Sequence, residues 1–366
     1  MPIPALADLA PVTPQATRLY AEQANVLASL VSQRLAQHPR LDEFLNGNPF
    51  RLIEVNHRNH AAFVAEVLRT NNLDLLARTL SWAYHAYHHQ GVSYDYFPAQ
   101  LDAWKQVIRD QLPIDEAASL LPLYDWMLAA HPDTIRAAER YRAASPEVPT
   151  DLHEEYERIV EALIGGDHLA ILDRCHALLD AGMPFSHLLQ GLFYPAMVEV
   201  GARWERGQVS VALEHQATAM AYLVLSTLYY EQPFAAARRG KVIVASVSNE
   251  FHELGAWMVA SCLELDGWEV IFLASDCDAE TLIQAAKKQA PRFIALSITL
   301  TGNLHAARNI IADLRAALGP DSNTQILVGG RALLTAPSLV DSIGADRFLT
   351  DCEAIVTWAH TLENPI

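Results

Sequence analysis

Hydrophobic positions recur at helical spacing through the first 145 residues. Apolar side chains in residues 61–68 and 73–83 repeat every three or four positions, and Asn71 and Asn72 separate the two runs. The same spacing predicts helices over residues 98–112, 114–130 and 132–142, and no stretch alternates as a strand does. We therefore predict an all-helical domain over residues 1–145.

The segment from residue 143 to residue 150 marks a boundary. Its two prolines and small residues stop a helix, and Thr150 or Asp151 can cap the next one. Helical spacing then resumes and continues to residue 231, with breaks at Gly165–Gly166 and at residues 182–184. This pattern predicts a four-helix bundle over residues 151–232, with helices that include residues 152–163, 168–181 and 186–203.

The pattern changes after residue 240. The runs 241–247, 293–297 and 325–328 are short, apolar and rich in β-branched residues, and an amphipathic segment over 256–266 follows the first of them. Strands that alternate with helices predict a parallel sheet. We expect a Rossmann-like, flavodoxin-like domain over residues 240–366, and an α + α/β protein as a whole.

Composition and charge narrow the function classes. A length of 366 residues suits two or three domains, and a net charge of -17 argues against a general nucleic-acid surface, which needs clustered Lys and Arg. The 4 cysteines form no CxxC pair, which favours a reducing compartment over a disulfide framework or a zinc site. We find no signal peptide and no apolar run that could span a bilayer, so we expect a cytoplasmic protein with no membrane partner.

Candidate chemistry stands directly after the first predicted strand. Ligands bind at the carboxyl ends of strands in open α/β sheets, and His252 falls at such a position. Glu250, two residues earlier, can accept the hydrogen bond of the other ring nitrogen and so make the imidazole a better metal ligand. Gly255 would let the loop turn tightly. The alternative is an ordinary loop histidine.

Three motifs in this region together resemble a known family. An acid-x-His-x-x-Gly loop, a Ser-x-Thr segment and a Gly-Gly pair follow successive strands, at spacings similar to those in the cobalamin-binding domain of methionine synthase, the mutases and the light-sensing repressors. The resemblance implies that an imidazole replaces the nucleotide tail of cobalamin as the lower ligand of cobalt, with the tail buried in the sheet. The implied cofactor-binding residues are Glu250, His252, Gly255, Ser297, Thr299, Gly329 and Gly330, with His252 as the metal ligand.

The resemblance implies a role for each position. Glu250 would orient His252, Ser297 would hydrogen-bond in the tail pocket, and Gly329 and Gly330 would leave room for the tail. Two departures stand out: Glu250 replaces the commoner Asp, and Thr299 stands where Leu is usual.

The end of the predicted bundle carries a second resemblance. Trp204 followed by Glu214 and His215 is similar to the helical cap of the adenosylcobalamin photoreceptors of the carotenoid-repressor type. That likeness implies that Trp204 packs beside the upper ligand, that Glu214 hydrogen-bonds it, and that His215 lies near the cobalt once the ligand is lost. Glu205 occupies the place of a second family histidine. The alternative is a core tryptophan and a surface Glu-His pair.

Aromatic and imidazole side chains are dense in the helical amino-terminal domain. Trp82, His85 and His89 share one helical face, and Tyr94 follows in a loop. Such groups could line a flat conjugated ligand, or they could form an aromatic core with histidines at its rim. The domain order resembles the photocobilins, which bind cobalamin and biliverdin. No cysteine precedes Cys175, so a bilin in this domain would be held noncovalently.

These observations predict a light sensor and not an enzyme. No basic recognition helix is present among the first 145 residues, and no barrel for isomerisation or methyl transfer is evident. The expected protein binds adenosylcobalamin, with its cobalt, together with biliverdin. It would form a homo-oligomer, signal to a protein partner and bind no nucleic acid directly. Two alternatives remain: a corrinoid carrier for a methyltransferase, and a cobalamin-dependent regulator that binds a protein partner.

Overall fold

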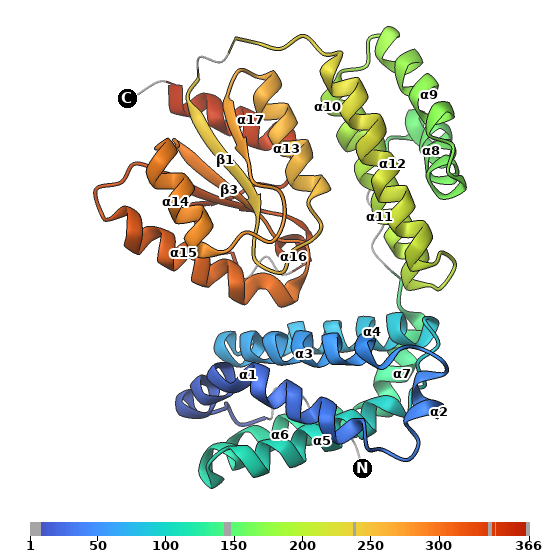
Figure 1. Cartoon of the computed structure of the whole chain (residues 1–366), viewed down its shortest axis with the longest axis vertical. Helices are drawn as coiled ribbons and strands as arrows, with labels where there is room; N and C mark the ends of the chain where they lie inside the picture. Colours follow the sequence, from blue (N-terminus) through green and yellow to red (C-terminus); the bar gives the residue numbers. More distant parts are fainter. Residues whose placement is uncertain (1–8, 143–147, 237–238, 336–338, 341, 364–366) are drawn as a thin grey trace. The chain divides into compact units, whose positions relative to one another are not determined.

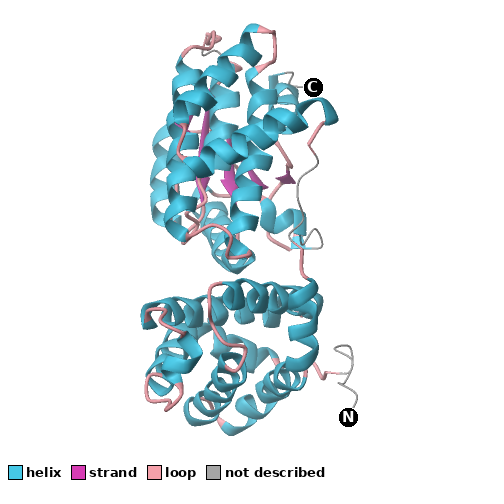
Figure 2. Cartoon of the chain, turned by 90° about the vertical axis from the view of Figure 1, so that its right-hand side faces the viewer, coloured by secondary structure: helices cyan, strands magenta, loops and turns pink. Residues whose placement is uncertain are grey.

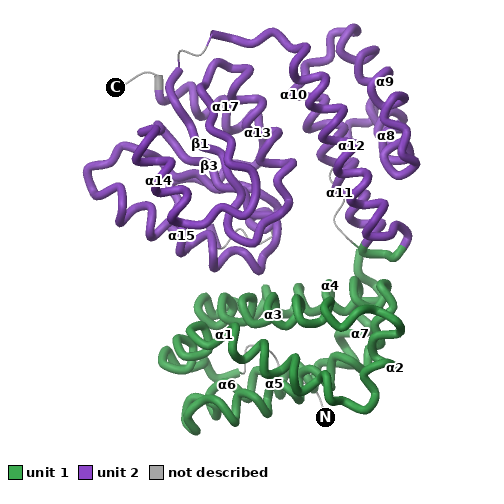
Figure 3. The backbone as a smooth tube through the Cα atoms, in the orientation of Figure 1, with its two compact units in different colours: residues 1–143, 205–207 green, residues 144–204, 208–366 purple. Residues whose placement is uncertain are grey.

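A computed structural model describes residues 9–142, 148–236, 239–335, 339–340 and 342–363. The chain divides into two compact units (Figure 3). The first unit is Met1–Ala143 with Glu205–Gly207, and the second is Ala144–Trp204 with Gln208–Ile366. Most of the predicted linker, residues 143–147, lies outside the described residues.

The first unit is helical throughout its described residues, as predicted. Helix α1 packs against α3 and α5, α5 packs against α6, and α4 packs against α7 (Figure 1). The predicted break at Asn71 and Asn72 is confirmed, because Asn71 adopts a left-handed conformation and the Asn72 side chain caps the next helix. The helices are α1 Pro14–Leu35, α2 Leu41–Leu45, α3 Phe50–Thr70, α4 Leu73–His89, α5 Tyr96–Gln111, α6 Ile114–Ala129 and α7 His131–Arg140.

The second unit begins with the predicted four-helix bundle, which we term the cap. A short 3₁₀ turn, η2 Thr150–Leu152, precedes it. The helix predicted over residues 186–203 is confirmed, but it contains a π-helical turn, η3 Leu189–Phe193, that was not predicted. A π turn inserts a residue into an otherwise helical pattern, so apolar spacing alone does not show it. The cap helices are α8 His153–Gly165, α9 His168–Asp180, α10 Phe185–Leu188, which continues through η3 into α11 Tyr194–Glu205, and α12 Val211–Tyr230.

A five-stranded parallel sheet follows the cap, in the order β2-β1-β3-β4-β5. All strands of the described residues belong to the second unit, and Figure 2 shows the strands in magenta. The strands are β1 Lys241–Ser246, β2 Glu269–Phe272, β3 Phe293–Ser297, β4 Gln325–Gly329 and β5 Arg347–Phe348. The sequence pattern found β1, β3 and β4. It missed β2, an edge strand that is only partly buried, and β5, which is too short to show a period.

Helices cover the sheet and complete the predicted Rossmann-like domain. They are α13 Leu254–Leu265, α14 Ala279–Gln289, α15 Leu304–Leu318, α16 Arg331–Thr335 and α17 Cys352–His360, with 3₁₀ turns η4 Thr301–Asn303 and η6 Thr361–Glu363. One core joins alternate strand residues, including Val244, Ala295 and Leu327, to side chains of α13 and α17. Since strand side chains alternate between faces, this core defines the sheet face that α13 and α17 cover.

The cap and the sheet domain share a second core. Leu254, Met258 and Cys262 of α13 and Cys352 of α17 join the buried side chains of the bundle. The Gln190 amide oxygen, presented by the π turn, accepts hydrogen bonds from the backbone N–H groups of Cys352 at 2.6 Å and Glu353 at 3.1 Å. The four cysteines are free thiols, as the sequence predicted. None of the helices in the described ranges combines the length and apolarity of a membrane span.

Candidate functional site

The loop between β1 and α13 pairs an acid with an imidazole. Glu250 Oε1 accepts hydrogen bonds from His252 Nδ1 at 2.6 Å and from the His252 backbone N–H at 3.2 Å. The Glu250 side chain is fully buried, whereas the His252 side chain is 56% exposed. Because a carboxylate only accepts, Nδ1 carries the proton, and in the neutral imidazole Nε2 keeps a lone pair. The imidazole can therefore bind a metal through Nε2.

The second oxygen of Glu250 joins this loop to the segment after β3. Oε2 accepts hydrogen bonds from the backbone N–H groups of Thr299 at 2.8 Å and Leu300 at 2.9 Å, and from Asn303 Nδ2 at 3.0 Å. Asn303 Nδ2 also donates to the carbonyl oxygen of Asn249 at 3.1 Å. Thr299 contributes a backbone group, so the unusual side chain at this position leaves the contact unchanged.

Asn303 is a site residue that the sequence did not reveal. It ends the 3₁₀ turn η4, and no motif marks it. Only the folded β3–α15 connection brings its amide to Glu250, more than fifty residues earlier in the chain. The general signal is that a buried carboxylate needs several hydrogen-bond donors, which an asparagine near the end of the next strand can supply.

The charges of the pair stabilise each other. Burial opposes ionisation of Glu250, but hydrogen bonds from His252, Leu300 and Asn303 outweigh it and hold the pKa of the carboxyl below its ordinary value. The hydrogen bond to Glu250 raises the pKa of His252 against the effect of burial. Glu214 of the cap adds a smaller rise to the pKa of His252. The cap acid thus acts on the imidazole of the sheet.

Ser297, Gly329 and Gly330 lie at the carboxyl ends of β3 and β4. Ser297 pairs in register with Gly329, and both are partly exposed. Gly330 has φ +105°, and a Cβ there would overlap the Ile298 backbone, while a Cβ on Gly329 would lie 3.0 Å from the Leu349 carbonyl oxygen. The fold itself therefore requires Gly330, apart from any room that the glycines leave for a ligand.

Gly255 corrects a sequence expectation. It lies in the first turn of α13 and its φ is not positive, so it does not make a tight turn. No atom lies within 4 Å of the position that its Cβ would take. What the glycine leaves is open space beside the start of α13.

The cap residues lie at the start of α12 and the end of α11. Trp204 is partly buried. Glu214 Oε2 accepts a hydrogen bond from His215 Nδ1 at 2.6 Å, and its Oε1 accepts one from Thr218 Oγ1 at 3.0 Å. The His215 side chain is 75% exposed. Glu214 and His215 therefore form a hydrogen-bonded pair whose ring is open to a ligand.

Apolar side chains are exposed beside these groups, where water would normally disfavour them. No group of three or more potential metal ligands occurs among the described residues, so His252 does not belong to a cluster of that size. Exposed apolar surface next to the exposed imidazole of His252 is what a large, partly apolar cofactor that carries its own metal would need. The exposed residues are Val211 and Leu213 at the start of α12, and Phe251, Leu300 and Leu334 at the carboxyl edge of the sheet.

Comparison with protein families decides what this surface binds. Two family models, each described as a B12 binding domain, match residues 155–229 and 240–356. The chain is a cobalamin-binding protein. The first match coincides with the cap and the second with the sheet domain, so both parts of the candidate site lie within cobalamin-binding domains.

The chain is also similar to several known proteins. The chain is 26% identical over 250 residues to the HTH-type transcriptional repressor CarH of Myxococcus xanthus, covering 68% of this chain and 80% of that protein. It is 28% identical to trimethylamine corrinoid protein 1 of Methanosarcina acetivorans, covering 46% of this chain and 79% of that protein. The solved monomethylamine corrinoid protein of Methanosarcina barkeri aligns with TM-score 0.49 and 18% identity, over 58% of this chain and 99% of that one.

The second set of predicted residues lies in the first unit, on helix α4 and in the loop after it. His85 is buried, its Nδ1 donates to the Ala138 carbonyl oxygen at 3.0 Å, and its ring lies 4.2 Å from that of His89. Trp82 donates its indole N–H to Glu205 at 2.9 Å. Tyr94 stacks instead on His88, with ring centroids 4.0 Å apart.

A buried aromatic and imidazole cluster of the first unit was not predicted. It lies between α1, α3, α5 and α6 and includes fully buried histidine and tyrosine rings. Ser32 Oγ donates to the Ala28 carbonyl oxygen, so it accepts from His57 Nδ1 at 2.8 Å, and His57 Nε2 accepts from Tyr96 at 3.0 Å. Both ring nitrogens of a neutral His57 therefore have hydrogen-bond partners inside the protein. The cluster is part of the packed core.

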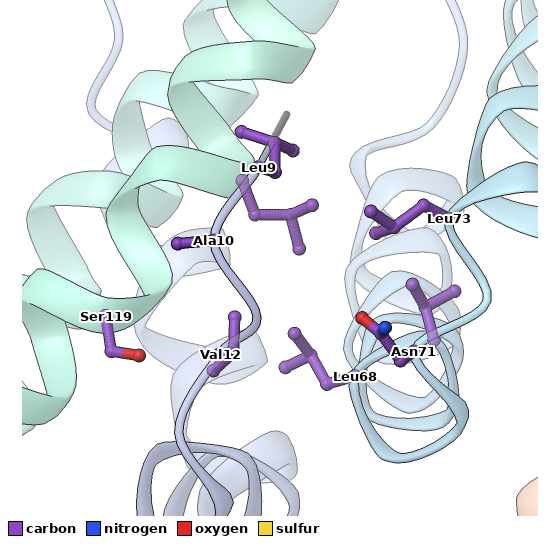
Figure 4. Close-up of a pocket in the computed structure, with 9 residues that line it drawn as sticks. Leu9, Ala10, Val12, Leu68, Asn71, Leu73 and Ser119 are labelled. Atoms are coloured by element: carbon purple, nitrogen blue, oxygen red, sulfur yellow. The ribbon is translucent and has the colours of Figure 1, made fainter. Parts of the chain in front are cut away.

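A shallow pocket of the first unit also lies away from the predicted bilin residues. It is formed by the segment before α1, the junction of α3 and α4, and α6 (Figure 4). Its lining is aliphatic except for one serine and one asparagine, and it contains no aromatic or imidazole side chain. The lining residues are Leu9, Ala10, Val12, Val67, Leu68, Asn71, Leu73, Ser119 and Leu123.

Proposed function

We propose that this protein is a light sensor that binds adenosylcobalamin, with His252 as the lower ligand of cobalt. The cofactor supplies a weak cobalt–carbon bond that absorbs visible light and breaks. His252 binds through Nε2, and Glu250 holds the ring in that orientation. In this proposal the buried tail would lie among residues at the ends of β3 and β4 and in the first turn of α13, namely Ser297, Thr299, Gly329, Gly330 and Gly255.

The observation that carries this proposal is the hydrogen bond between Glu250 and His252, which leaves an exposed imidazole within the region that matches a B12 binding domain. Glu214 of the cap contributes to the raised pKa of His252. In this proposal Trp204, Glu214 and His215 would cover the upper face of the bound cofactor. The named repressor CarH, similar over 68% of this chain, supports a regulatory function for this arrangement.

The protein's response follows from the shared core of cap and sheet. Trp204 and Glu214 would contact the upper ligand, so two cofactor states that differ in this ligand would favour different arrangements of the cap. We infer that the cap then repacks on α13 and α17 and changes a homo-oligomer or a contact with a protein partner in the cytoplasm. In this proposal the protein is a switch, not an enzyme, and it binds no nucleic acid directly.

A corrinoid carrier is the second candidate. The named trimethylamine corrinoid protein is similar over 79% of its length. A carrier would present its corrinoid to a separate methyltransferase, so the cap would have to uncover the upper face in the dark. Hydrogen-bonded Glu214 and partly buried Trp204 favour the sensor, because a carrier has no need of a cage for an adenosyl group.

Biliverdin binding by the first unit is a separate part of the proposal. It is supported by the resemblance in domain order and by the partly exposed rings around Trp82, His89 and Tyr94. His85 would contribute from the buried side of the same helix. The bilin would be noncovalent, because the first unit has no cysteine.

One reconstitution experiment tests both parts. The full chain is loaded in the dark with adenosylcobalamin, with or without biliverdin, and its spectrum and size-exclusion profile are recorded before and after green or red light. We expect green light to change the cobalamin spectrum and the elution volume together, and biliverdin to add a red-absorbing band. Trp204→Ala should release the adenosyl group faster, whereas Leu169→Ala, an exposed cap position, should behave as the wild type.

Two results would contradict the proposal. Photolysis that leaves the elution volume and the cap unchanged would favour the carrier. Wild-type retention of the adenosyl group by Trp204→Ala would remove the cap from the upper face.

A further inference from the structure

A buried hydroxyl at the end of β1 lacks a hydrogen-bond partner. Ser246 has no exposed surface, and its Oγ makes no hydrogen bond to any described residue. The backbone of Ser246 is satisfied, because its N–H donates to Ala274 at 2.8 Å and its carbonyl accepts from Cys277 at 3.1 Å. The side-chain oxygen alone has no partner. A buried hydroxyl without a partner costs free energy in the folded protein, so it needs an explanation.

The register of the sheet places Ser246 next to the tail pocket. Ser246 pairs with Ser297 of β3, and Ser297 pairs with Gly329 of β4. Side chains two residues earlier in each strand, Val244, Ala295 and Leu327, lie in the core under α13 and α17. Because strand side chains alternate, the three residues Ser246, Ser297 and Gly329 form a row on that same face.

The row changes from partly exposed to fully buried across the sheet. Gly329 and Ser297 are partly exposed, and Ser246, in the neighbouring strand, is not. A ligand that enters between the sheet and α13 would reach the Ser246 hydroxyl at its innermost point.

We propose that Ser246 is a hydrogen-bonding residue of the tail pocket, recognising the nucleotide part of a complete cobalamin beyond the contact expected of Ser297. This inference rests on the proposed binding of cobalamin through His252. The base, ribose and phosphate of the nucleotide carry acceptors, and once buried they need donors. Ser246 supplies a hydroxyl donor, which has no hydrogen-bond partner among the described residues when the ligand is absent. It therefore favours complete cobalamins over corrinoids without a nucleotide.

The test compares two corrinoids that differ in the tail. Dissociation constants for hydroxocobalamin and for hydroxocobinamide, which lacks the nucleotide, are measured by absorption titration for the wild type and for Ser246→Ala. The variant should bind hydroxocobalamin about tenfold more weakly and hydroxocobinamide equally well. Without ligand it should melt at the same or a higher temperature, because an unsatisfied hydroxyl has been removed.

Ser261→Ala is the matched control. Ser261 is also buried, but its Oγ already donates to the Trp257 carbonyl oxygen at 2.9 Å. This variant should lose stability without changing the preference between the two corrinoids. An equal change of both dissociation constants in Ser246→Ala, or no change in either, would overturn the inference while leaving cobalamin binding intact. A wild-type protein that binds neither corrinoid would overturn the proposed function as well.

Discussion

At the scale of single residues, the site depends on one carboxylate. Glu250 is fully buried and receives hydrogen bonds from His252, Thr299, Leu300 and Asn303. Its two oxygens thus connect the imidazole to the segment after β3. Glutamate, one methylene longer than the aspartate expected from the resemblance, can span this distance and still orient the ring. Buried carboxylates are stable only when such donors surround them.

Replacing Glu250 by Gln should disturb this network strongly. The amide keeps one acceptor but turns an NH₂ group toward N–H donors, so we expect the free energy of unfolding to fall by about 2 to 3 kcal/mol. Cobalamin affinity should fall about 10- to 100-fold, as for other partners of metal-binding histidines. Urea unfolding and absorption titration measure the two effects. Glu280→Gln, on the exposed face of α14, is the control and should change neither quantity.

The buried histidines of the first unit predict how stability depends on pH. Burial lowers the pKa of His57 from 6.5 to about 4. Burial, and then the neighbouring charge of His57, lowers the pKa of His60 to about 3. Between these values and 6.5 the unfolded chain binds more protons than the folded one. The stability present above pH 6.5 is therefore lost as the pH falls toward 4.

The expected size of this loss can be measured with one variant. His57 alone should reduce the free energy of unfolding by about 2 kcal/mol between about pH 7.5 and about pH 5. His57→Gln should show a smaller difference between the two conditions, and His88→Gln, an exposed position, should keep the wild-type difference. Equal pH dependence of His57→Gln and the wild type would contradict a neutral, buried His57. Urea titration at the two pH values gives the result.

At the scale of elements, the turn between β4 and α16 illustrates how backbone geometry dictates a residue. Gly330 has φ +105°, and its missing side chain allows close approach to Ile298. Gly330→Ala should lower the free energy of unfolding by more than about 2 kcal/mol, because strain and overlap add. Gly182→Ala, with φ +94° but nothing within 4 Å, should cost about 1 kcal/mol from strain alone. Thermal unfolding of the two variants separates the effects, and equal losses would contradict the overlap.

Apolar spacing in the sequence was enough to predict most elements of the site. The β1, β3 and β4 runs are buried and β-branched, so their pattern is clear, and the motifs that follow them meet at one sheet edge. The π turn at Leu189–Phe193, the short strand β5 and the role of Asn303 could not be predicted. They depend on contacts between segments far apart in the chain, and the hydrophobic periodicity of a local segment does not reveal such contacts.

In the first unit the sequence pattern indicated helices but not their packing. The spacing placed His85 and His89 on one helical face, and their rings do contact each other. It did not indicate that Tyr94, from the following loop, stacks on His88. Helical spacing tells which side chains share a face, but it does not tell which helix that face meets. The buried cluster around His57 was missed because its rings come from four separate helices.

At the scale of the whole molecule, the side chain of Gln190 links the cap to the sheet domain by hydrogen bonds. Its amide oxygen accepts from two backbone N–H groups at the start of α17. Gln190→Ala leaves these groups without that acceptor and should lower the free energy of unfolding by about 2 kcal/mol. Backbone amides of Cys352 and Glu353 should then exchange hydrogen faster. Gln190→Glu, which keeps the acceptor oxygens at a helix amino terminus, should restore slow exchange.

A Gln190→Ala variant with unchanged exchange at α17 would mean that the cap is held to the sheet by the apolar core alone. That core includes Met258, Cys262 and Cys352. The proposed movement of the cap after photolysis would then have to break apolar contacts only.

The central claim is that His252 binds cobalt, and electron paramagnetic resonance tests it most directly. The full chain is labelled with nitrogen-15 at histidine, loaded with unlabelled cobalamin and reduced to the paramagnetic Co(II) state. An imidazole ligand predicts that each cobalt line is split into a doublet by nitrogen-15, and His252→Ala should lose this splitting. A triplet from nitrogen-14 in the labelled wild type would show that the nucleotide base, not His252, remains on the cobalt.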